Sequence, residues 1–353
     1  MTDASDERRY DIVTADDIDD GRVTDAYFER TEEILEAEDV NPEVVADVGE
    51  DIDDWHVFAG LKDVAKLLEG KPIDLYSVPE GTLFKENPVM YIEGDYLDFA
   101  RYETTILGFI CQASGIATSA MRVKAAADEK DVISFGTRRQ HPSTAAMIER
   151  SAMLGGMDGI SNVAGGEIIG VEAGGTMPHA LVISMRDQEK AWGAYNRVLD
   201  EEVPRVMLCD TYSDERDEAV RAAELLGDDL DSVRLDTTSS RRGDFREIIE
   251  EVRWELDARG FDDVGIFVSG GIGVEDILEL KDVVDGFGVG GSVANSPPVD
   301  FSLDIVEVEG EFAAKKGERC GKKQIYRDGM DDTVVLADSD EENEVKVEGE
   351  PLL

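Results

Sequence analysis

One short run of residues combines the side-chain types that bind a flat anion. Phe135 is followed by a glycine, a threonine and two arginines, in the order Phe135-Gly136-Thr137-Arg138-Arg139. An aromatic ring stacks on a planar ligand, and paired guanidinium groups bind carboxylate or phosphate oxygens. The chain carries 81 Asp and Glu against 35 Lys and Arg, so its overall field repels anions and binding needs such local arginines. A second doublet, Arg241-Arg242, either grips the same anion or pairs with surface carboxylates.

Two glycine clusters have the composition of phosphate-binding loops. Ser269-Gly270-Gly271-Ile272-Gly273 precedes a helix predicted to begin near Val274, and Gly288-Val289-Gly290-Gly291-Ser292 follows the next apolar run. Glycines allow consecutive backbone N–H groups to point at one anion. Since a phosphate site after the last two strands recurs in α/β barrels, we predict one here. The alternative is that these glycines only form tight turns.

Three further polar residues stand at the ends of predicted strands. Arg234 and Asp236 are two residues apart, so on a strand they share one face. A cation and a carboxylate placed together could bind a sugar diol, and Asp210, which ends the neighbouring strand, could bind the same ribose or a hydrated Mg²⁺. The alternative for each is a structural salt bridge or a helix N-cap.

The chain has only three histidines. His179 ends the run Gly174-Gly175-Thr176-Met177-Pro178-His179, in which a rigid proline would hold the imidazole at the start of the next element. His56, beside Trp55, is predicted to pack, and His141, before Pro142, is predicted to cap or support the site. A lone histidine is usually structural, so residue chemistry alone leaves the role of His179 open.

The elements that must position these residues alternate regularly from Asp131 onward. Such alternation is typical of parallel βα units, and we expect an irregular α/β barrel with its site at the carboxyl ends of the strands. A doubly wound open sheet is the competing arrangement. The predicted strands are Val132–Phe135, Gly159–Val163, Ala180–Met185, Val206–Cys209, Val233–Leu235, Val264–Val268 and Gly286–Val289, and the main helices are Ser143–Leu154, Asp214–Leu226 and Asp244–Ala258.

The segments on either side of the barrel, residues 129–296, are predicted to form an open-faced α+β sandwich. Residues 21–128 begin with a helix over Gly21–Ala37, continue with short strands around a helix at Asp63–Leu68, and end in apolar helical sequence over Ala100–Ala127. Residues 297–338 supply strands that return to this domain, namely Phe301–Val308, Phe312–Ala314 and Gln324–Arg327. Residues 1–20 and 339–353 are expected to be acidic tails.

Composition excludes several classes of function. Phosphate-backbone binding needs a basic surface, so nucleic acid is not an expected partner at a net charge of -46. The three cysteines are far apart, which supports neither a disulfide framework nor a thiolate zinc site. The N-terminus lacks a signal-peptide pattern, and we expect no stretch to be apolar enough to span a bilayer. A cytoplasmic protein that does not bind membranes is therefore expected.

The acidity also predicts a response to salt. Acid spread along the whole chain is typical of proteins adapted to a salt-filled, halophilic cytoplasm, where ions screen the repulsion between carboxylates. Stability followed by circular dichroism is therefore expected to rise from low to molar KCl. A flat profile would show that this acidity is not a salt adaptation.

Taken together, these residues resemble nicotinate phosphoribosyltransferase, of the type II phosphoribosyltransferase group and its salt-adapted, archaeal-like branch. The likeness extends from about Gly21 to Arg327 in family order. Its motifs are Thr24-Asp25-Ala26-Tyr27-Phe28, Ile92-Glu93-Gly94-Asp95-Tyr96, Tyr102-Glu103-Thr104, Phe135 to Arg139, Gly159-Ile160-Ser161-Asn162-Val163, Gly175 to His179, Arg234-Leu235-Asp236 and the two glycine clusters.

The resemblance implies an enzyme that joins nicotinate to phosphoribosyl pyrophosphate, giving nicotinate mononucleotide and pyrophosphate on the route to NAD. It implies a dimer or larger homo-oligomer with sites between subunits. Mg²⁺ would accompany pyrophosphate, and ATP would be a co-substrate that phosphorylates His179. Such chemistry depends on positioning and charge rather than on a strong general base.

The resemblance also assigns roles to individual residues. Phe135 would stack on the pyridine ring, with Tyr27 of a neighbouring subunit on its other face. Arg138 and Arg234 would bind phosphoribosyl and carboxylate groups, and Asp236 the ribose. The remaining predicted substrate contacts are Arg139, Ser161, Asp210, Ser269, Gly270, Gly271, Gly288, Gly290 and Gly291.

The chain departs from the family in one respect, and two other functions stay open. Some relatives carry a cysteine-rich zinc knuckle near the C-terminus, whereas Cys320 stands alone here, so no structural zinc is predicted. One alternative is quinolinate phosphoribosyltransferase, which must bind a second carboxylate and decarboxylate its product. The other is a catalytically silent phosphosugar-binding protein of the same fold.

Overall fold

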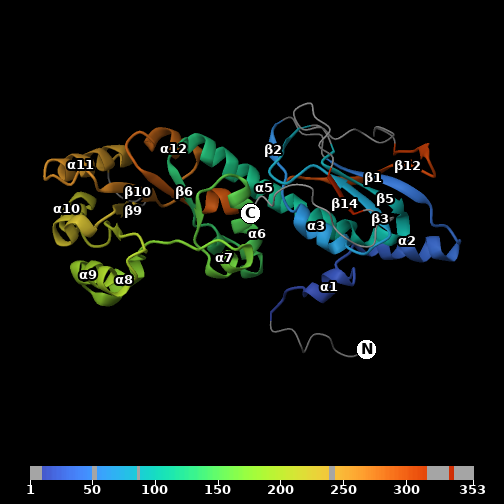
Figure 1. The fold of residues 1–353 in the computed structure, drawn as a ribbon, viewed down its shortest axis with the longest axis horizontal. Coiled ribbons are helices and arrows are strands. Elements are labelled where there is room, and N and C mark those ends of the chain that lie inside the picture. The colour runs from blue at the N-terminus through green and yellow to red at the C-terminus, as the bar shows by residue number, and fades with distance from the viewer. Residues whose placement is uncertain (1–9, 50–53, 86–87, 238–242, 316–333, 338–353) are drawn as a thin grey trace. The chain divides into compact units, whose positions relative to one another are not determined.

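The computed structural model describes residues 10–49, 54–85, 88–237, 243–315 and 334–337. The chain divides into two compact units, one made of Met1–Thr118 with Pro297–Leu353 and the other of Ser119–Ser296. The boundary lies inside the long helix α5 (Glu103–Ala127), whereas the sequence placed it after that helix. Figure 1 shows both units and labels their elements where there is room.

The second unit is built on one curled parallel sheet. In spatial order its strands are β7 (Gly159–Ile160), β6 (Asp131–Ser134), β11 (Gly286–Val289), β10 (Gly265–Ser269), β9 (Ser232–Leu235) and β8 (Val206–Leu208), and every pairing is parallel. Counting from β8, each strand lies beside the next one in the chain until β11, which lies beside β6. This is the order of a ring opened between β7 and β8. A doubly wound sheet would reverse its order at a switch point, so the predicted irregular α/β barrel is confirmed and the open-sheet alternative is wrong.

The opening of the ring coincides with a strand that was predicted wrongly. Ala180–Met185 was expected to be a strand, but the segment forms the helix α8 (His179–Met185). Pro178 is its N-cap residue, and Val182 is the only residue of the helix that is buried. A central strand would need burial on both faces, which this run does not obtain.

The next helix, α9 (Gln188–Val198), satisfies the exposed edge of the sheet. The Nε2 of Gln188 and the Nε1 of Trp192 donate to the carbonyl oxygen of Leu208 at 2.8 and 3.1 Å, and both side chains are buried. Leu208 is the last residue of the edge strand β8. The helix therefore satisfies one backbone acceptor that an open edge would leave unpaired.

The other helices of the barrel follow the predicted pattern. α6 (Ala145–Leu154), α10 (Glu215–Leu226) and α11 (Phe245–Asp257) begin and end within two residues of the predicted bounds, and α7 (Val163–Ile169), α12 (Val274–Leu280) and α13 (Gly291–Ala294) are shorter. Asp214 and Asp244 accept backbone N–H groups as N-caps of α10 and α11. The strand predicted over Gly159–Val163 ends at Ile160, because Asn162 already caps α7.

The first unit is an antiparallel sheet with helices packed on one face. Its strand order is β13 (Glu311–Phe312), β12 (Ser302–Val308), β1 (Glu43–Gly49), β5 (Met90–Asp95), β3 (Ile73–Ser77) and β14 (Val334–Ala337). Apolar residues of α3 (Leu61–Leu68) and α5 form one core with this sheet. The predicted return of the C-terminal segment is confirmed, since β12 pairs with β1. Predicted strand Gln324–Arg327 lies outside the described residues.

The smaller elements of this unit include two corrections. Residues 1–20 were predicted to be an acidic tail, but α1 (Ala15–Asp19) forms there because Thr14 and Asp17 make a reciprocal capping box. The helix predicted from Gly21 begins later, as α2 (Ala26–Ala37), since Gly21 has a φ of +63° and Asp25 is the N-cap residue. β2 (His56–Val57) pairs with β4 (Leu83–Phe84), and α4 (Tyr96–Phe99) precedes α5.

One apolar helix contradicts the prediction that no stretch of the chain is apolar enough to span a bilayer. The continuous helical run Tyr96–Ala127 is long and apolar enough to cross a membrane by length and composition. Of its most apolar window, 56% is buried inside the protein, as in a helix that forms part of a core.

A carboxyl at the start of α5 makes stability depend on pH. Burial and, to a smaller extent, the carboxylates of Asp304 and Asp25 raise the pKa of Glu103 from 4.5 to about 7, against the lowering effect of Lys315. A raised folded-state pKa means that the stabilising, proton-bound form is present below the unfolded pKa and is lost as pH rises through about 7. We therefore expect Glu103→Gln to be more stable than wild type by about 1–3 kcal/mol at alkaline pH and nearly equal to it near pH 4.5, in urea unfolding at both pH values.

Glu38→Gln is the matched control, because Glu38 is exposed at the C-terminal end of α2. A stability difference for Glu103→Gln that is the same at both pH values would contradict this assignment.

Candidate active site

Residues from distant parts of the sequence meet at the carboxyl ends of the barrel strands. Asp210 follows β8, Asp236 follows β9 and Gly270 follows β10, while Phe135 follows β6 and Gly290 follows β11. Neighbouring parallel strands end side by side, so these residues share one edge of the sheet. In barrels this edge carries the site, which is where the sequence placed it.

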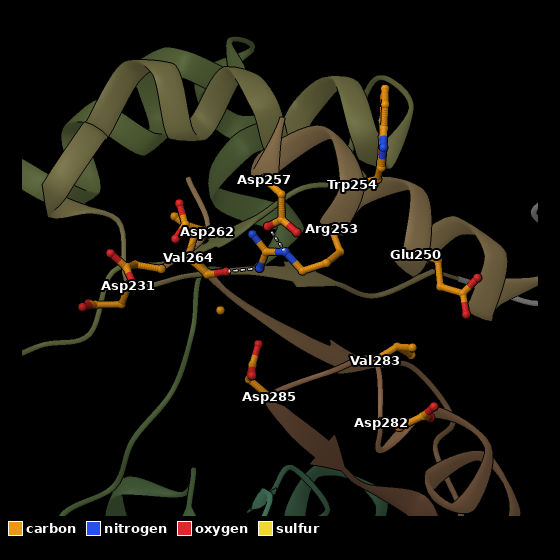
Figure 2. Close-up of a pocket in the computed structure, with 12 residues that line it drawn as sticks. Asp231, Glu250, Arg253, Trp254, Asp257, Asp262, Val264, Asp282, Val283 and Asp285 are labelled. Atoms are coloured by element: carbon orange, nitrogen blue, oxygen red, sulfur yellow. Dashed lines mark hydrogen bonds and ion pairs between the residues drawn. The ribbon is translucent and has the colours of Figure 1, made fainter. Parts of the chain in front are cut away.

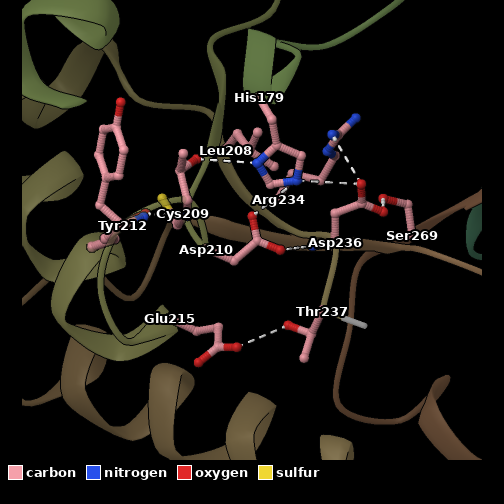
Figure 3. A network of polar contacts seen from close by, with 12 residues as sticks. His179, Leu208, Cys209, Asp210, Tyr212, Glu215, Arg234, Asp236, Thr237 and Ser269 are labelled. Carbon is pink, nitrogen blue, oxygen red and sulfur yellow. Dashed lines mark hydrogen bonds and ion pairs between the residues drawn. The ribbon is translucent and has the colours of Figure 1, made fainter. Parts of the chain in front are cut away.

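The imidazole of His179 stands between two carboxylates (Figure 3). Its Nε2 is 3.6 Å from Oδ1 of Asp210 and 3.6 Å from Oδ2 of Asp236, and its Nδ1 is 3.2 Å from Oγ1 of Thr211. The backbone N–H of Asp236 donates to Oδ2 of Asp210 at 2.7 Å, which ties the two strand ends together. His179 is thus part of a polar network, and it stands at the start of the next element after Pro178, as predicted.

Arg234 lies on the same face of β9 as Asp236, as their spacing predicted. Its guanidinium is 3.8 Å from the Asp236 carboxylate and donates to the hydroxyl of Thr176. Ser269, at the end of the next strand, donates to the other oxygen of Asp236 at 2.9 Å. The carboxylate of Asp236 is therefore held from two sides, and Arg234 is buried.

Burial and neighbouring charges shift the pKa values of two groups in this cluster. Burial raises the pKa of Asp210 from 3.8 to about 6 against the lowering effects of His179 and the Asp236 backbone N–H, and Asp236 adds to the rise. Burial lowers the pKa of Arg234, the two carboxylates raise it, and the charge of Arg138 lowers it further. The charge of Arg138 therefore acts on Arg234, although the side chain of Arg138 is itself exposed.

The ring of Phe135 occupies space left by a glycine of β11. A Cβ added at Gly288 would lie 2.3 Å from Cε2 of Phe135. Gly286, two residues earlier on the same face, leaves similar room for the ring of Phe267, and the centroids of the two rings are 6.3 Å apart. The alternate glycines of β11 thus fix where the aromatic ring at the site can lie.

Adding a methyl group at Gly288 is expected to push the Phe135 ring out of this position. We expect Gly288→Ala to lower the free energy of unfolding by about 1–3 kcal/mol, and the double variant with Phe135→Leu to lose less than the sum of the two single changes. Thermal or urea unfolding measures this. Gly175→Ala is the control, since no atom of the described part of the chain lies within 4 Å of a Cβ there, and additive losses would contradict the proposed packing.

The predicted glycine clusters differ in backbone geometry. Gly270 and Gly271 have φ values of +103° and +86°, conformations that favour glycine, and a Cβ on Gly270 would lie 2.9 Å from Oδ1 of Asp236. Gly290 is close to the backbone of Phe135, because a Cβ there would lie 3.2 Å from that residue's carbonyl oxygen. Both clusters therefore allow close approach of backbone at the rim, as a phosphate cradle requires.

Sequence comparison decides the family. A family profile described as "Quinolinate phosphoribosyl transferase, C-terminal domain" matches residues 116–304, which is more than half of the chain, and the corresponding N-terminal domain profile matches residues 25–114. The chain belongs to the quinolinate phosphoribosyl transferase family. The predicted type II phosphoribosyltransferase group is thereby confirmed.

Individual relatives of this family carry two kinds of name. The crystal structure of nicotinate-nucleotide pyrophosphorylase from Pyrococcus furiosus is 54% identical, covers 93% of this chain and 86% of that one, and superposes with a TM-score of 0.89. A nicotinate phosphoribosyltransferase of Mycobacterium tuberculosis is 31% identical over 79% of this chain, and one of Bacillus subtilis is 30% identical over 71%. The chain spans only 62% and 54% of the length of these two relatives.

Other residues predicted for the site belong to other elements of the chain. Arg138 and Arg139 form an exposed turn after Phe135, and Ser161 precedes α7. Tyr27 belongs to the other unit, on α2, where its side chain is exposed. Arg241 and Arg242 lie outside the described residues, as does Cys320.

The two remaining histidines lie elsewhere. His141 accepts the backbone N–H of Ser143 and so acts as a cap, as predicted. His56 lies on β2 in the first unit, with its ring 6.0 Å from that of Phe84, which agrees with the packing role. Neither contributes to the cluster around His179.

Sequence reasoning missed three residues that hold the cluster. Thr176 accepts from Arg234, Thr211 contacts the imidazole of His179, and Glu218 accepts from the backbone of the loop after Asp210. Thr211 adjoins Asp210 in the sequence, and Thr176 belongs to the glycine run that ends at His179, which was the available signal. Glu218 is eight residues beyond Asp210 on a helix, and its spacing alone gives no indication of this contact.

A separate hollow of about 610 Å³ lies at the opposite ends of the strands (Figure 2). Asp231 precedes β9 and Asp285 precedes β11, so the hollow faces the amino ends of the sheet. Seven carboxylates line it, and the guanidinium of Arg253 is held by Asp257 and by the carbonyl oxygens of Val264 and Phe261. None of the predicted site residues lies in it.

Proposed function

We propose that this protein is a nicotinate phosphoribosyltransferase, which transfers the phosphoribosyl group of phosphoribosyl pyrophosphate to nicotinate in NAD biosynthesis. The observation that carries the proposal is the imidazole of His179 held between Asp210 and Asp236, with the buried Arg234 3.8 Å from the Asp236 carboxylate. The names of the mycobacterial and Bacillus relatives support it. The family as a whole supports phosphoribosyl pyrophosphate and a pyridine carboxylate as substrates.

In the proposed reaction the nicotinate ring nitrogen attacks C1′ of the ribose. The C1′–O bond to pyrophosphate breaks, a C1′–N bond forms, and the electron pair leaves with pyrophosphate. Positive charge develops on the sugar ring, so the carboxylate of Asp236 beside the ribose would stabilise it, and Arg138 and Arg234 would stabilise the anionic groups. Phe135 would stack on the pyridine ring, and the glycine clusters would bind the 5′-phosphate.

Mg²⁺ is proposed to bind together with pyrophosphate. Mg²⁺ in such sites takes one or two carboxylates and completes its shell with phosphates and water. Among the residues that the structure describes, Oδ1 of Asp210 is buried without a hydrogen-bond partner, which fits a carboxylate that can accept such a ligand, and Asp236 lies beside it. When bound, the ion would neutralise charge on the leaving group. Within the described part of the chain no group of three or more His, Cys, Asp or Glu is arranged to hold a metal by itself.

ATP coupling through His179 is part of the same proposal. A nitrogen of the imidazole would attack the γ-phosphorus of ATP, an N–P bond would form as the bond to ADP breaks, and the imidazole proton would pass to a neighbouring carboxylate. Asp210 is suited to this because burial raises its pKa to about 6. Hydrolysis of the phosphohistidine would then favour synthesis.

Quinolinate phosphoribosyl transfer is the second candidate, and the family profile favours it by name. Quinolinate carries two carboxylates and would need more positive charge than nicotinate. In this cluster the carboxylates of Asp210 and Asp236 already balance part of the positive charge of the arginines. Less positive charge is left for a second substrate carboxylate, so the cluster suits a monocarboxylate better.

Further features of the resemblance remain proposals. A homo-oligomer would let Tyr27 of one subunit reach the site of another, and its exposed side chain on α2 is compatible with that role. A cytoplasmic location is proposed from the lack of a signal-peptide pattern. The absence of structural zinc is proposed because Cys320 stands alone in the sequence.

The proposal is tested by pyrophosphate release from phosphoribosyl pyrophosphate with Mg²⁺ in high KCl. Nicotinate, quinolinate and nicotinamide are supplied in parallel, each with and without ATP. Release of one pyrophosphate per nicotinate mononucleotide, increased by ATP, is expected with nicotinate. No release with any acceptor would favour a catalytically silent phosphosugar-binding protein.

A further inference from the structure

A fully buried carboxylate holds the loop that follows β8. Oε2 of Glu218 accepts the backbone N–H of Thr211 at 2.9 Å, and Oε1 accepts those of Tyr212 and Ser213 at 2.8 and 2.7 Å. Glu218 lies in the first turn of α10, directly after this loop. One side chain therefore satisfies three consecutive backbone donors.

This arrangement fixes the shape of the loop. A buried charge is costly unless hydrogen bonds compensate it, and three short charge-assisted bonds do so here. Both oxygens are acceptors, and both are used. A glutamine would offer one oxygen and one NH₂ group, and that NH₂ group would face backbone N–H groups and repel them.

The loop held by Glu218 also supplies two of the contacts to His179. Thr211 gives its N–H to Glu218 and places its hydroxyl 3.2 Å from Nδ1 of the imidazole. Asp210, the preceding residue, faces Nε2. Any shift of the loop therefore moves groups on both sides of the ring.

These contacts also favour one tautomer of the neutral imidazole. Nε2 faces oxygens of two carboxylates, which are acceptors when ionised, so the hydrogen is favoured on Nε2. Nδ1 is then free to accept the hydroxyl hydrogen of Thr211.

We propose that Glu218 is a positioning residue for His179, which acts through Thr211 to fix the orientation of the imidazole and to keep its hydrogen on Nε2. The part that concerns ATP coupling rests on the function proposed above. The part that concerns the imidazole stands on the geometry alone.

The test is nitrogen NMR of ring-¹⁵N-labelled histidine in the full chain, in alkaline buffer where the imidazoles are neutral. With three histidines in the sequence, variants His56→Gln and His141→Gln assign the His179 signals. Wild type is expected to show mainly the Nε2–H tautomer. In Glu218→Gln the ratio of the Nε2–H to the Nδ1–H tautomer is expected to fall about three- to tenfold, as for loss of one hydrogen bond.

Glu224→Gln is the matched control. It removes the same charge from the same helix at an exposed position, and it is expected to leave the His179 signals unchanged. Equal His179 spectra in wild type and Glu218→Gln would overturn the proposal. So would an equal change in both glutamine variants, since helix charge would then be the cause.

Thr211→Val keeps the backbone bonds to Glu218 and removes only the hydroxyl, so it tests the proposal even if Glu218→Gln fails to fold. The same fall in the tautomer ratio is expected, and an unchanged ratio would overturn the proposed route through Thr211. In activity assays, both variants should lower the ratio of rates with and without ATP. Absence of product in wild type would refute the proposed function and leave the NMR result to decide the role of Glu218.

Discussion

Replacing Arg234 by glutamine is expected to lower kcat/KM for phosphoribosyl pyrophosphate by about 10²–10³-fold, the usual effect of removing one charged donor from a site where transition-state charge is stabilised. Arg234 is buried, lies 3.8 Å from Asp236 and interacts electrostatically with Asp210 and Arg138. Its loss would remove the cation on the strand face where the ribose ligand is proposed. Steady-state pyrophosphate release, with phosphoribosyl pyrophosphate varied at saturating nicotinate, measures the effect.

Two variants sharpen this result. Arg259→Gln removes the same charge from the end of α11, where the arginine pairs with Glu255 on the surface, and should change kcat/KM little. Arg234→Lys keeps a charge but loses the fork of donors, so partial activity is expected. A value for Arg234→Gln within a few fold of wild type would exclude Arg234 from the proposed anion-binding role.

Replacing His179 by alanine is expected to abolish stimulation by ATP, so that the ratio of initial rates with and without ATP falls to about one. The imidazole is the nucleophile in the proposed phosphoryl transfer, and among the described residues it is the histidine that faces Asp210 and Asp236. Acid-labile phosphate on the protein after incubation with labelled ATP gives a second readout. That label should also be absent from the variant.

His141→Ala provides the comparison, because His141 caps a turn outside the cluster and should keep ATP stimulation. Stimulation that persists in His179→Ala would show that ATP acts at another residue, and the phosphohistidine would have to be abandoned.

The most predictable residues of the site are those that stand at the end of a strand. Asp210, Arg234 and Asp236 reached the same rim because parallel neighbours end together and a spacing of two preserves the face. The barrel itself followed from the alternation of apolar runs and helices. These are local patterns, which a single sequence carries in full.

Other features depend on contacts that no local pattern encodes. The run Ala180–Met185 is apolar enough for a strand, but it forms the helix α8, in which only Val182 is buried. The bonds of Glu218 to three backbone N–H groups depend on how α10 packs behind the β8 loop. The space beneath Phe135 exists because Gly288 lies opposite it on another strand, a pairing that sequence separation conceals.

The most direct test of the proposed function is a competition in one tube. Ring-deuterated nicotinate and unlabelled quinolinate are mixed at equal concentration with phosphoribosyl pyrophosphate, Mg²⁺ and ATP, and the nicotinate mononucleotide formed is analysed by mass spectrometry. A nicotinate phosphoribosyltransferase should give heavy product in excess over light product by at least about 100-fold, with no release of CO₂. Light product accompanied by an equal amount of CO₂ would show that quinolinate is the substrate and would contradict the proposal.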